Sequence, residues 1–447
     1  MSASGVSSQH KTDQVFNILV VGCSYGGLAT VVNLLDLCNR EVSRFSIYAA
    51  LPESPVQRAI ATRITIVDER DGFYHVIGSP LALLARDYAS KAWVRFQDIP
   101  ALQTPRVRFL HGSVVSVDCE SKSVSIIDCQ TKQEFDEGYD YLVVASGLKR
   151  VWPSVPQSLT KDDYLSETGE HIDSVTCATR HGVAIIGGGG VGVEMAAELK
   201  LVHPNIAVKL IHSRNKLMSS EPLPDGFKDR VCSVLQEAGI EVLLDKRVTD
   251  TEAVDDDRSD KLFRISLADG SRIVVSHVIT AISRSVPTTW YLPDAALDSN
   301  GYVKICPSYE FGFSQVICIV LIMSSISRLR FSSDVPNAKY HFAVGDIVAW
   351  SGIKRCGAAM HMGHYAARNM HQQMLSELAT GINGSLTPTV VELEETPPMI
   401  GVALGKKAVC YDPAEGTTVG EDLMAALFGD DLGFGICWGY MQLGQMP

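Results

Sequence analysis

The sequence lacks any Cys-x-x-Cys pair, although it contains 11 cysteines. Because their number is odd and they are scattered, we interpret them as reduced thiols rather than as the disulfide framework of a secreted protein. A redox disulfide of the Cys-x-x-Cys kind is excluded.

Positive charge is also scarce: the sequence has 39 Lys and Arg residues and 51 Asp and Glu residues, so its formal net charge is −12. Nucleic-acid binders need a cationic footprint, so we expect no nucleic-acid partner. The apolar run Val316–Met323 falls far short of the ~20 residues that a membrane-spanning helix requires. Residues 1–14 are polar and Ser-rich and lack a signal core. We therefore expect a disordered tail there and a cytoplasmic protein.

Two glycine-rich loops are the most informative feature that is present. Gly22–Gly27 follows the apolar run Ile18–Val21, and Gly187–Gly192 follows Val183–Ile186. Each loop opens a helical pattern. A strand that leads through a tight glycine turn into a helix N-terminus forms a binding site for a pyrophosphate. Two such sites on one chain predict two dinucleotides between which electrons pass.

The second strand of the first unit, Arg63–Val67, ends in Asp68. An acid at this point accepts hydrogen bonds from a ribose, usually ~20 residues after the glycine loop. Here it comes much later, so we expect an insertion between the first helix and the second strand. Further along, Tyr139–Gly147 predicts a buried strand, and Tyr340–Asp346 a strand that ends in Gly-Asp.

Three later segments carry weaker predictions. Arg272–Ile282 reads as a strand, and Gly420–Met441 as a helix with an aromatic tail. Phe313–Ser333 has an apolar run without periodicity, and we expect much of it to lie outside the native core.

These motifs resemble the two-dinucleotide flavin reductases, and among them the apoptosis-inducing-factor-like branch, which is related to the type II NADH dehydrogenases. The resemblance extends from about Asn17 to the C-terminus. It is carried by both glycine loops and by four further segments: Val67–His75, Ala145–Gly147, His212–Arg214 and Gly345–Asp346.

The resemblance implies an α/β fold with two Rossmann-like dinucleotide-binding domains, as in glutathione reductase, and a small α+β C-terminal interface region. FAD would bind a discontinuous domain of residues 15–150 and 301–380, and NAD(P)H a domain of residues 151–300. Residues 381–447 would form the interface region.

Site residues follow from the family positions. The FAD contacts would be Gly22, Ser24, Gly26, Gly27, Asp68, Arg70, Val114, Ala145, Gly147 and Asp346. The NAD(P)H pyrophosphate would lie on Gly187, Gly189 and Gly192. The chain departs from the family pattern twice: Ser24 replaces the middle glycine, and Leu81 stands where relatives carry an FAD-contacting Arg.

Two residues are candidates for proton chemistry, and a third for nucleotide selection. Glu194, in the first turn after the second loop, would face the nicotinamide, or else it is an ordinary acid favoured by the helix dipole. His361 would shuttle a proton, or else it packs locally. Arg214 would pair with a 2′-phosphate and make NADPH at least as good a donor as NADH, or else it is a solvated charge. We expect no metal site.

The predicted activity is hydride transfer from NAD(P)H to FAD and then to a quinone or another small acceptor. Two alternatives stay open: a flavin oxygenase or oxidase that tailors a secondary metabolite, and a non-enzymatic redox sensor in death signalling. The resemblance also leaves open a homodimer and peripheral contact of the C-terminal region with an organelle outer membrane. The acidic pair Asp430 and Asp431 makes deep insertion unfavourable.

Overall fold

The computed structural model describes residues 14–44, 58–255, 261–282, 286–307, 327–350, 353–379, 388, 390–393 and 397–447. The predicted tail lies outside these residues, apart from its last residue, Gln14, and so does the run Val316–Met323.

The larger sheet is parallel in its centre and antiparallel at both edges. The centre consists of β20 (His341–Ala343), β8 (Tyr141–Val144), β1 (Val15–Val21), β2 (Ala61–Asp68) and β5 (Val107–Asp118). One edge adds β6 (Ser123–Asp128) and β7 (Glu134–Gly138), and the other adds β19 (Ser327–Phe331) and β18 (Ile305–Pro307). Strands from distant parts of the chain thus build one sheet.

The second unit is a smaller parallel sheet. Its order is β12 (Glu241–Leu243), β11 (Val208–Ile211), β10 (Val183–Ile186) and β16 (His277–Thr280), with helices α5 (Gly190–Val202) and α6 (Asp225–Glu237). An antiparallel sheet of β13 (Val248–Asp255), β14 (Lys261–Leu267) and β15 (Arg272–Val275) lies beside it. These two units confirm the predicted fold class.

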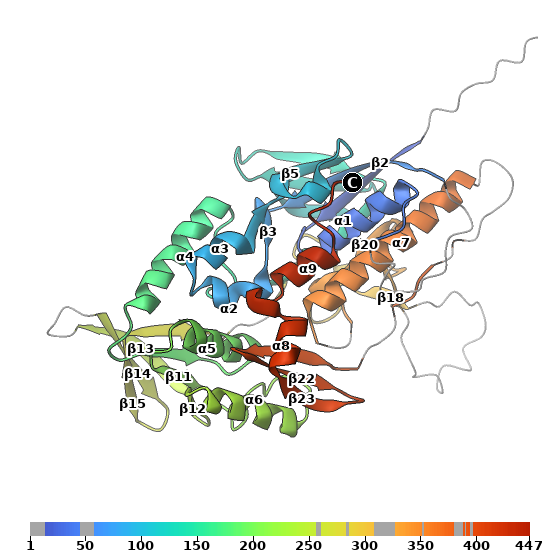
Figure 1. Cartoon of the computed structure of the whole chain (residues 1–447). Coiled ribbons are helices and arrows are strands. Elements are labelled where there is room, and N and C mark those ends of the chain that lie inside the picture. The colour runs from blue at the N-terminus through green and yellow to red at the C-terminus, as the bar shows by residue number, and fades with distance from the viewer. Residues whose placement is uncertain are drawn as a thin grey trace, which may run out of the picture.

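Two helices pack closely over the larger sheet. They are α1 (Tyr25–Cys38) and α7 (Cys356–Ala379), which lie side by side in Figure 1. A methyl group on Gly363 of α7 would lie 2.4 Å from the carbonyl oxygen of Gly26 in α1. The missing side chain therefore permits this approach, which brings the start of α7 to the first glycine loop.

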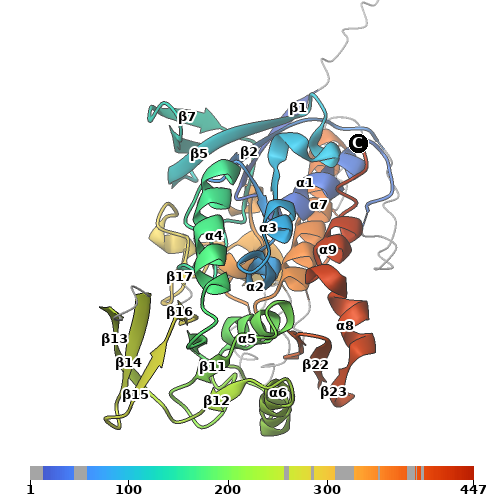
Figure 2. The same cartoon turned by 60° about the vertical axis from the view of Figure 1, so that its left-hand side comes forward.

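The C-terminal region bridges the two units. Its antiparallel sheet is β21 (Ile400–Leu404), β22 (Lys407–Asp412) and β23 (Gly416–Gly420), followed by α8 (Glu421–Leu427) and α9 (Phe434–Tyr440). Val402, Leu404 and Val409 join the core of the second unit, while Phe434 and Cys437 join the core of the first. Figures 1 and 2 both show α9 beside α7, and α8 close to the sheet of β21, β22 and β23.

The remaining strands and α-helices of the described residues are mostly short. They are β3 (Gly72–Tyr74), β4 (Trp93–Arg95), β9 (Leu148–Lys149), β17 (Val286–Pro287), α2 (Ser79–Ala82), α3 (Arg86–Ala92) and α4 (Lys161–Thr176). No helix among the described residues is long and apolar enough to cross a membrane.

Two sequence predictions need correction, and a third is tested only at the end of its segment. Gly420–Met441 is not one helix, because Leu432 and Gly433 adopt left-handed backbone and separate α8 from α9. Arg272–Ile282 contains two strands, β15 and β16, which belong to different sheets. The end of Phe313–Ser333 is core: β19 pairs with β20, and its Leu329 and Phe331 are fully buried.

Candidate functional site

The two glycine loops share one backbone design. Gly22 and Gly187 have positive φ, 85° and 118°, which favours glycine. A methyl group on Gly27 would lie 2.1 Å from the Gly22 carbonyl oxygen, and one on Gly192 would lie 1.8 Å from that of Gly187. The first glycine therefore makes the turn, and the last allows the helix to pack on it, as in dinucleotide-binding folds.

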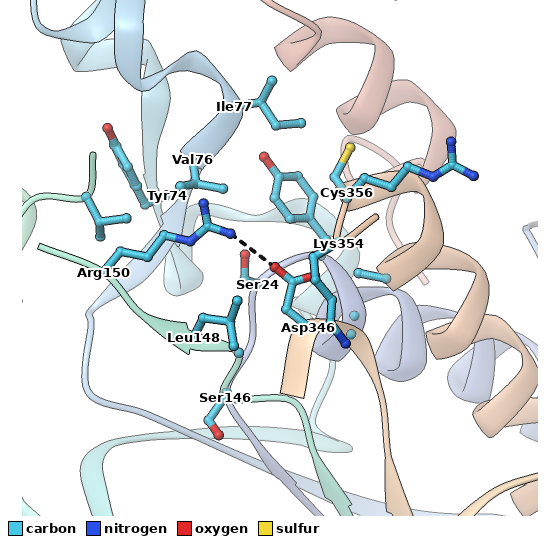
Figure 3. A pocket seen from close by; sticks show the side chains of 18 of the residues that line it. Ser24, Tyr74, Val76, Ile77, Ser146, Leu148, Arg150, Asp346, Lys354 and Cys356 are labelled. Carbon is cyan, nitrogen blue, oxygen red and sulfur yellow. Dashed lines mark hydrogen bonds and ion pairs between the residues drawn. The ribbon is translucent and has the colours of Figure 1, made fainter. Parts of the chain in front are cut away.

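The middle position differs between the loops. Gly189 is extended, and a methyl group there would meet nothing within 4 Å. Ser24 is also outside the left-handed region, at φ −87°, so its side chain causes no backbone strain. Its hydroxyl does not cap α1. Ser24 points into the cavity in Figure 3, where it is available to a ligand.

A single cavity of about 1100 Å³ joins the two units. Ten of the sequence-predicted site residues line it: Gly22, Ser24, Gly26, Asp68, Arg70, Val114, Ala145, Gly147, Glu194 and Asp346. The predicted residues that do not line it are Gly27, Gly187, Gly189, Gly192, Arg214 and His361. The start of α5 contributes Gly190 and Val191, so the second loop borders the same space.

Asp68 ends β2 beside the first loop, as the sequence predicts. Its carboxylate accepts hydrogen bonds from the Cys23 N–H at 2.7 Å and the Arg70 N–H at 2.9 Å. Burial raises the pKa of Asp68, and these two N–H groups oppose the shift. The insertion is also where we expect it, between α1 and β2, although most of it lies outside the described residues.

Positive groups face the cavity near the loop. The Arg150 guanidinium lies 3.4 Å from the Asp346 carboxylate, as the dashed line in Figure 3 marks. Burial raises the pKa of Asp346 and lowers that of Lys354, whose ammonium group donates to the Val348 carbonyl at 2.6 Å. The sequence reasoning missed Arg150 and Lys354. The available signal was a basic residue a few positions after the buried strand β8 and another just before α7.

These residues fit a dinucleotide. Among the described residues, the buried Nε of Arg70 has no hydrogen-bond partner. A methyl group on Gly147 would meet nothing within 4 Å, so backbone is exposed to a ligand there. Unpaired donors and close-approach glycines are what a pyrophosphate requires.

Glu194 lies on α5 at the border between the two units. Its carboxylate accepts a hydrogen bond from the Ala403 N–H at 3.2 Å. Burial, with a smaller effect of the neighbouring Glu198, raises the pKa of Glu194 to about 8, although the hydrogen bond from Ala403 opposes the shift. Burial also raises the pKa of Glu198 to about 7. The cavity is therefore lined by a carboxyl group that holds a proton at neutral pH.

His212 occupies the end of β11, where NAD-binding proteins often carry an acid. Its Nδ1 accepts a hydrogen bond from the Gly188 N–H at 3.1 Å, so its Nε2 carries the proton and donates to the Ser219 hydroxyl at 3.0 Å. Burial lowers the pKa of His212, which favours this neutral form. The imidazole thus supports the second loop.

Arg214 is exposed and lies 3.4 Å from the Ser219 hydroxyl. Lys216 forms an ion pair with Asp229 at 2.5 Å. Arg214 is therefore the cation of this segment that is less engaged by protein groups.

His361 does not line the cavity. Its Nε2 lies 2.8 Å from the Tyr440 hydroxyl, and the two rings stack. Leu81 also lies outside the lining and packs beside the cluster that contains Phe428 and Leu432. Among the described residues, no cluster of metal-binding side chains is found.

Residues 16–315 match the model of a protein family described as "Pyridine nucleotide-disulphide oxidoreductase". The chain belongs to this family. Oxidoreductase OXR1 of Ajellomyces capsulatus is 47% identical over 451 residues, which cover 100% of this chain and 92% of that protein. Apoptosis-inducing factor homolog B of Dictyostelium discoideum is 23% identical over 367 residues, 80% of each protein, and supports the predicted resemblance.

The fold is that of solved members of the same class. The sulfide:quinone oxidoreductase of Aquifex aeolicus superposes with a TM-score of 0.60 at 15% identity, covering 97% of this chain and 93% of that one. Family and fold together make this chain an NAD(P)H-dependent flavoprotein oxidoreductase, with FAD and NAD(P)H as cofactors.

Proposed function

We propose that this protein takes a hydride from NAD(P)H to FAD and passes the electrons to a quinone-like acceptor. The observation that carries the proposal is the single cavity, which both nucleotide units border and into which Glu194 extends. FAD bound there supplies an acceptor for a hydride and a donor of electrons. The protein's own residues position the two dinucleotides and hold protons.

An apolar end of the cavity supports a quinone ring as the acceptor. Ile77, Ile400, Val402, Leu427 and Phe428 line it where the C-terminal region meets the first unit. A quinone takes up two protons with two electrons, and Glu194, which lines the cavity, holds a proton near neutral pH. A solved protein of this fold is named for quinone as well.

An anaerobic titration tests this function. NADPH, and then NADH, is added to the purified holoprotein while the flavin absorption bands are followed. We expect bleaching by the nucleotide and recovery when a short-chain quinone is added without oxygen. Recovery that requires oxygen and fails with quinone would favour the oxidase alternative, and a flavin that the nucleotide bleaches but that no acceptor reoxidises would favour the sensor. A flavin that neither nucleotide bleaches would contradict the proposal.

Replacing Arg214 by Ala tests the choice of nucleotide. We expect KM for NADPH to rise about tenfold, the effect of losing ~1.4 kcal/mol from one charged contact, and KM for NADH to change little. Lys216→Ala is the matched control, because Asp229 already engages that ammonium group. Equal effects of Arg214→Ala on both nucleotides would contradict a 2′-phosphate contact.

A further inference from the structure

One large aromatic side chain is exposed at the wall of the cavity. Trp290 lines the cavity and is 61% exposed. Its neighbours in the chain, Thr289 and Tyr291, are each only 4% exposed. Because both neighbours are buried, the exposure of the indole is not that of a loose surface loop. The fold therefore holds an apolar ring at the cavity wall and leaves its surface for a ligand to cover.

Hydrogen bonds fix the segment of residues 286–292, which carries this ring. The Tyr291 hydroxyl lies 2.8 Å from the Ser146 hydroxyl, in the stretch that follows β8. The Tyr291 carbonyl oxygen accepts the Val117 N–H of β5 at 2.9 Å. The Thr289 hydroxyl donates to the Gly301 carbonyl oxygen at 2.7 Å. The protein's own contacts thus set the position of the indole before any ligand binds.

The 286–292 segment crosses the sheet where the ribose of a dinucleotide is expected. In the larger sheet, β1 and β2 lie between β8 and β5, so a segment bonded to β5 and to the stretch after β8 reaches across the ends of the inner strands. Asp68, the expected ribose contact, ends β2 beside His111 of β5. Gly112 and Val114 continue β5 along the cavity wall. The cavity beyond Asp68 is therefore bordered by β5 and by the segment that carries Trp290.

We propose that Trp290 stacks on the adenine ring of FAD and favours FAD over flavins that lack adenine. With the pyrophosphate at the first glycine loop and the ribose at Asp68, the adenine must lie beyond Asp68, because it is bonded to that ribose. Base–aromatic stacking requires an exposed ring on a fixed support, and Trp290 provides both. The stack adds affinity and takes no part in hydride transfer, so Trp290 acts in cofactor selection and is not a catalytic residue.

A competition between two flavins tests the proposal on the full-length holoprotein. The protein is incubated to equilibrium with FAD and an excess of FMN, which has the same isoalloxazine ring but no adenine. Free flavin is then removed, and the bound flavins are extracted and quantified. We expect the ratio of bound FAD to bound FMN to fall about tenfold in Trp290→Ala, the effect of losing one base–aromatic stack. Because both flavins need the folded chain, a loss of folded protein alone leaves this ratio unchanged.

Two further variants separate stacking from other effects of the substitution. Trp290→Phe keeps an aromatic face, so its ratio should stay within about threefold of the wild-type ratio. Val286→Ala removes another exposed apolar side chain of the same segment, one that does not line the cavity, and should leave the ratio unchanged.

Two results would overturn the proposal. One is an unchanged ratio in Trp290→Ala, and the other is a fall in Trp290→Phe as large as that in the alanine variant. Neither NAD(P)H nor a quinone takes part in the competition, so its result does not depend on which acceptor the enzyme uses.

Discussion

Gly192→Ala is expected to weaken NAD(P)H binding by about 5- to 150-fold while FAD stays bound. The new methyl group would lie 1.8 Å from the Gly187 carbonyl oxygen, so the loop or the start of α5 must move. Overpacking of this kind costs about 1–3 kcal/mol, and it falls on the backbone that would hold the pyrophosphate. Fluorescence titration with NADPH and the flavin content of the purified protein measure the two effects.

Gly189→Ala tests whether the nucleotide approaches the loop backbone closely, without causing a packing clash inside the protein. Its methyl group would meet no protein atom within 4 Å, so we expect the thermal stability of the protein to be unchanged and NAD(P)H affinity to fall. Gly226→Ala is the matched control, since that glycine of α6 is equally open and lies outside both glycine loops. Normal NADPH binding by Gly192→Ala would show that the second loop does not hold the nucleotide.

The strand–loop–helix units could be predicted because each depends on local sequence. The apolar runs before both loops become β1 and β10. Asp68 comes late in the sequence, but it still lies beside the first glycine loop, as predicted. The reason is that β2 pairs in parallel with β1, so that the end of β2 lies beside that loop.

The rest depended on contacts that no local pattern encodes. Arg150 faces Asp346 only after distant segments have packed. The sequence did contain a signal for the break between α8 and α9, because Gly433 occupies a left-handed position there. The prediction of one helix gave more weight to the apolar content of the segment. The sequence left open whether His361 shuttles a proton or packs locally, and its contact with the Tyr440 hydroxyl fits local packing.

The second large effect is expected for Glu194→Gln. If the protonated carboxyl group takes part in turnover, the wild-type kcat should fall as the pH rises through about 8, where Glu194 ionises. The glutamine variant cannot ionise, so its kcat should be lower by about 10²-fold, as for the loss of a general acid, and flat through this range. A pH profile of NADPH:quinone turnover measures both. Glu170→Gln, an exposed acid of α4, is the control and should keep the wild-type profile.

The same carboxyl groups predict a pH dependence of stability with a definite sign. Folding raises the pKa of Glu194 from 4.5 to about 8 and that of Glu198 to about 7, so the folded state binds more protons between these values. The free energy of unfolding should therefore be highest below about pH 4.5 with respect to these groups. Above that pH it should fall by up to ~1.4 kcal/mol per pH unit for each group, until the pH passes about 7 for Glu198 and about 8 for Glu194. Urea unfolding at pH 6 and 8.5 should show a smaller loss in Glu194→Gln than in the wild type. An equal loss in both proteins would mean that Glu194 is ionised in the folded state, and its assignment as a proton holder would then be wrong.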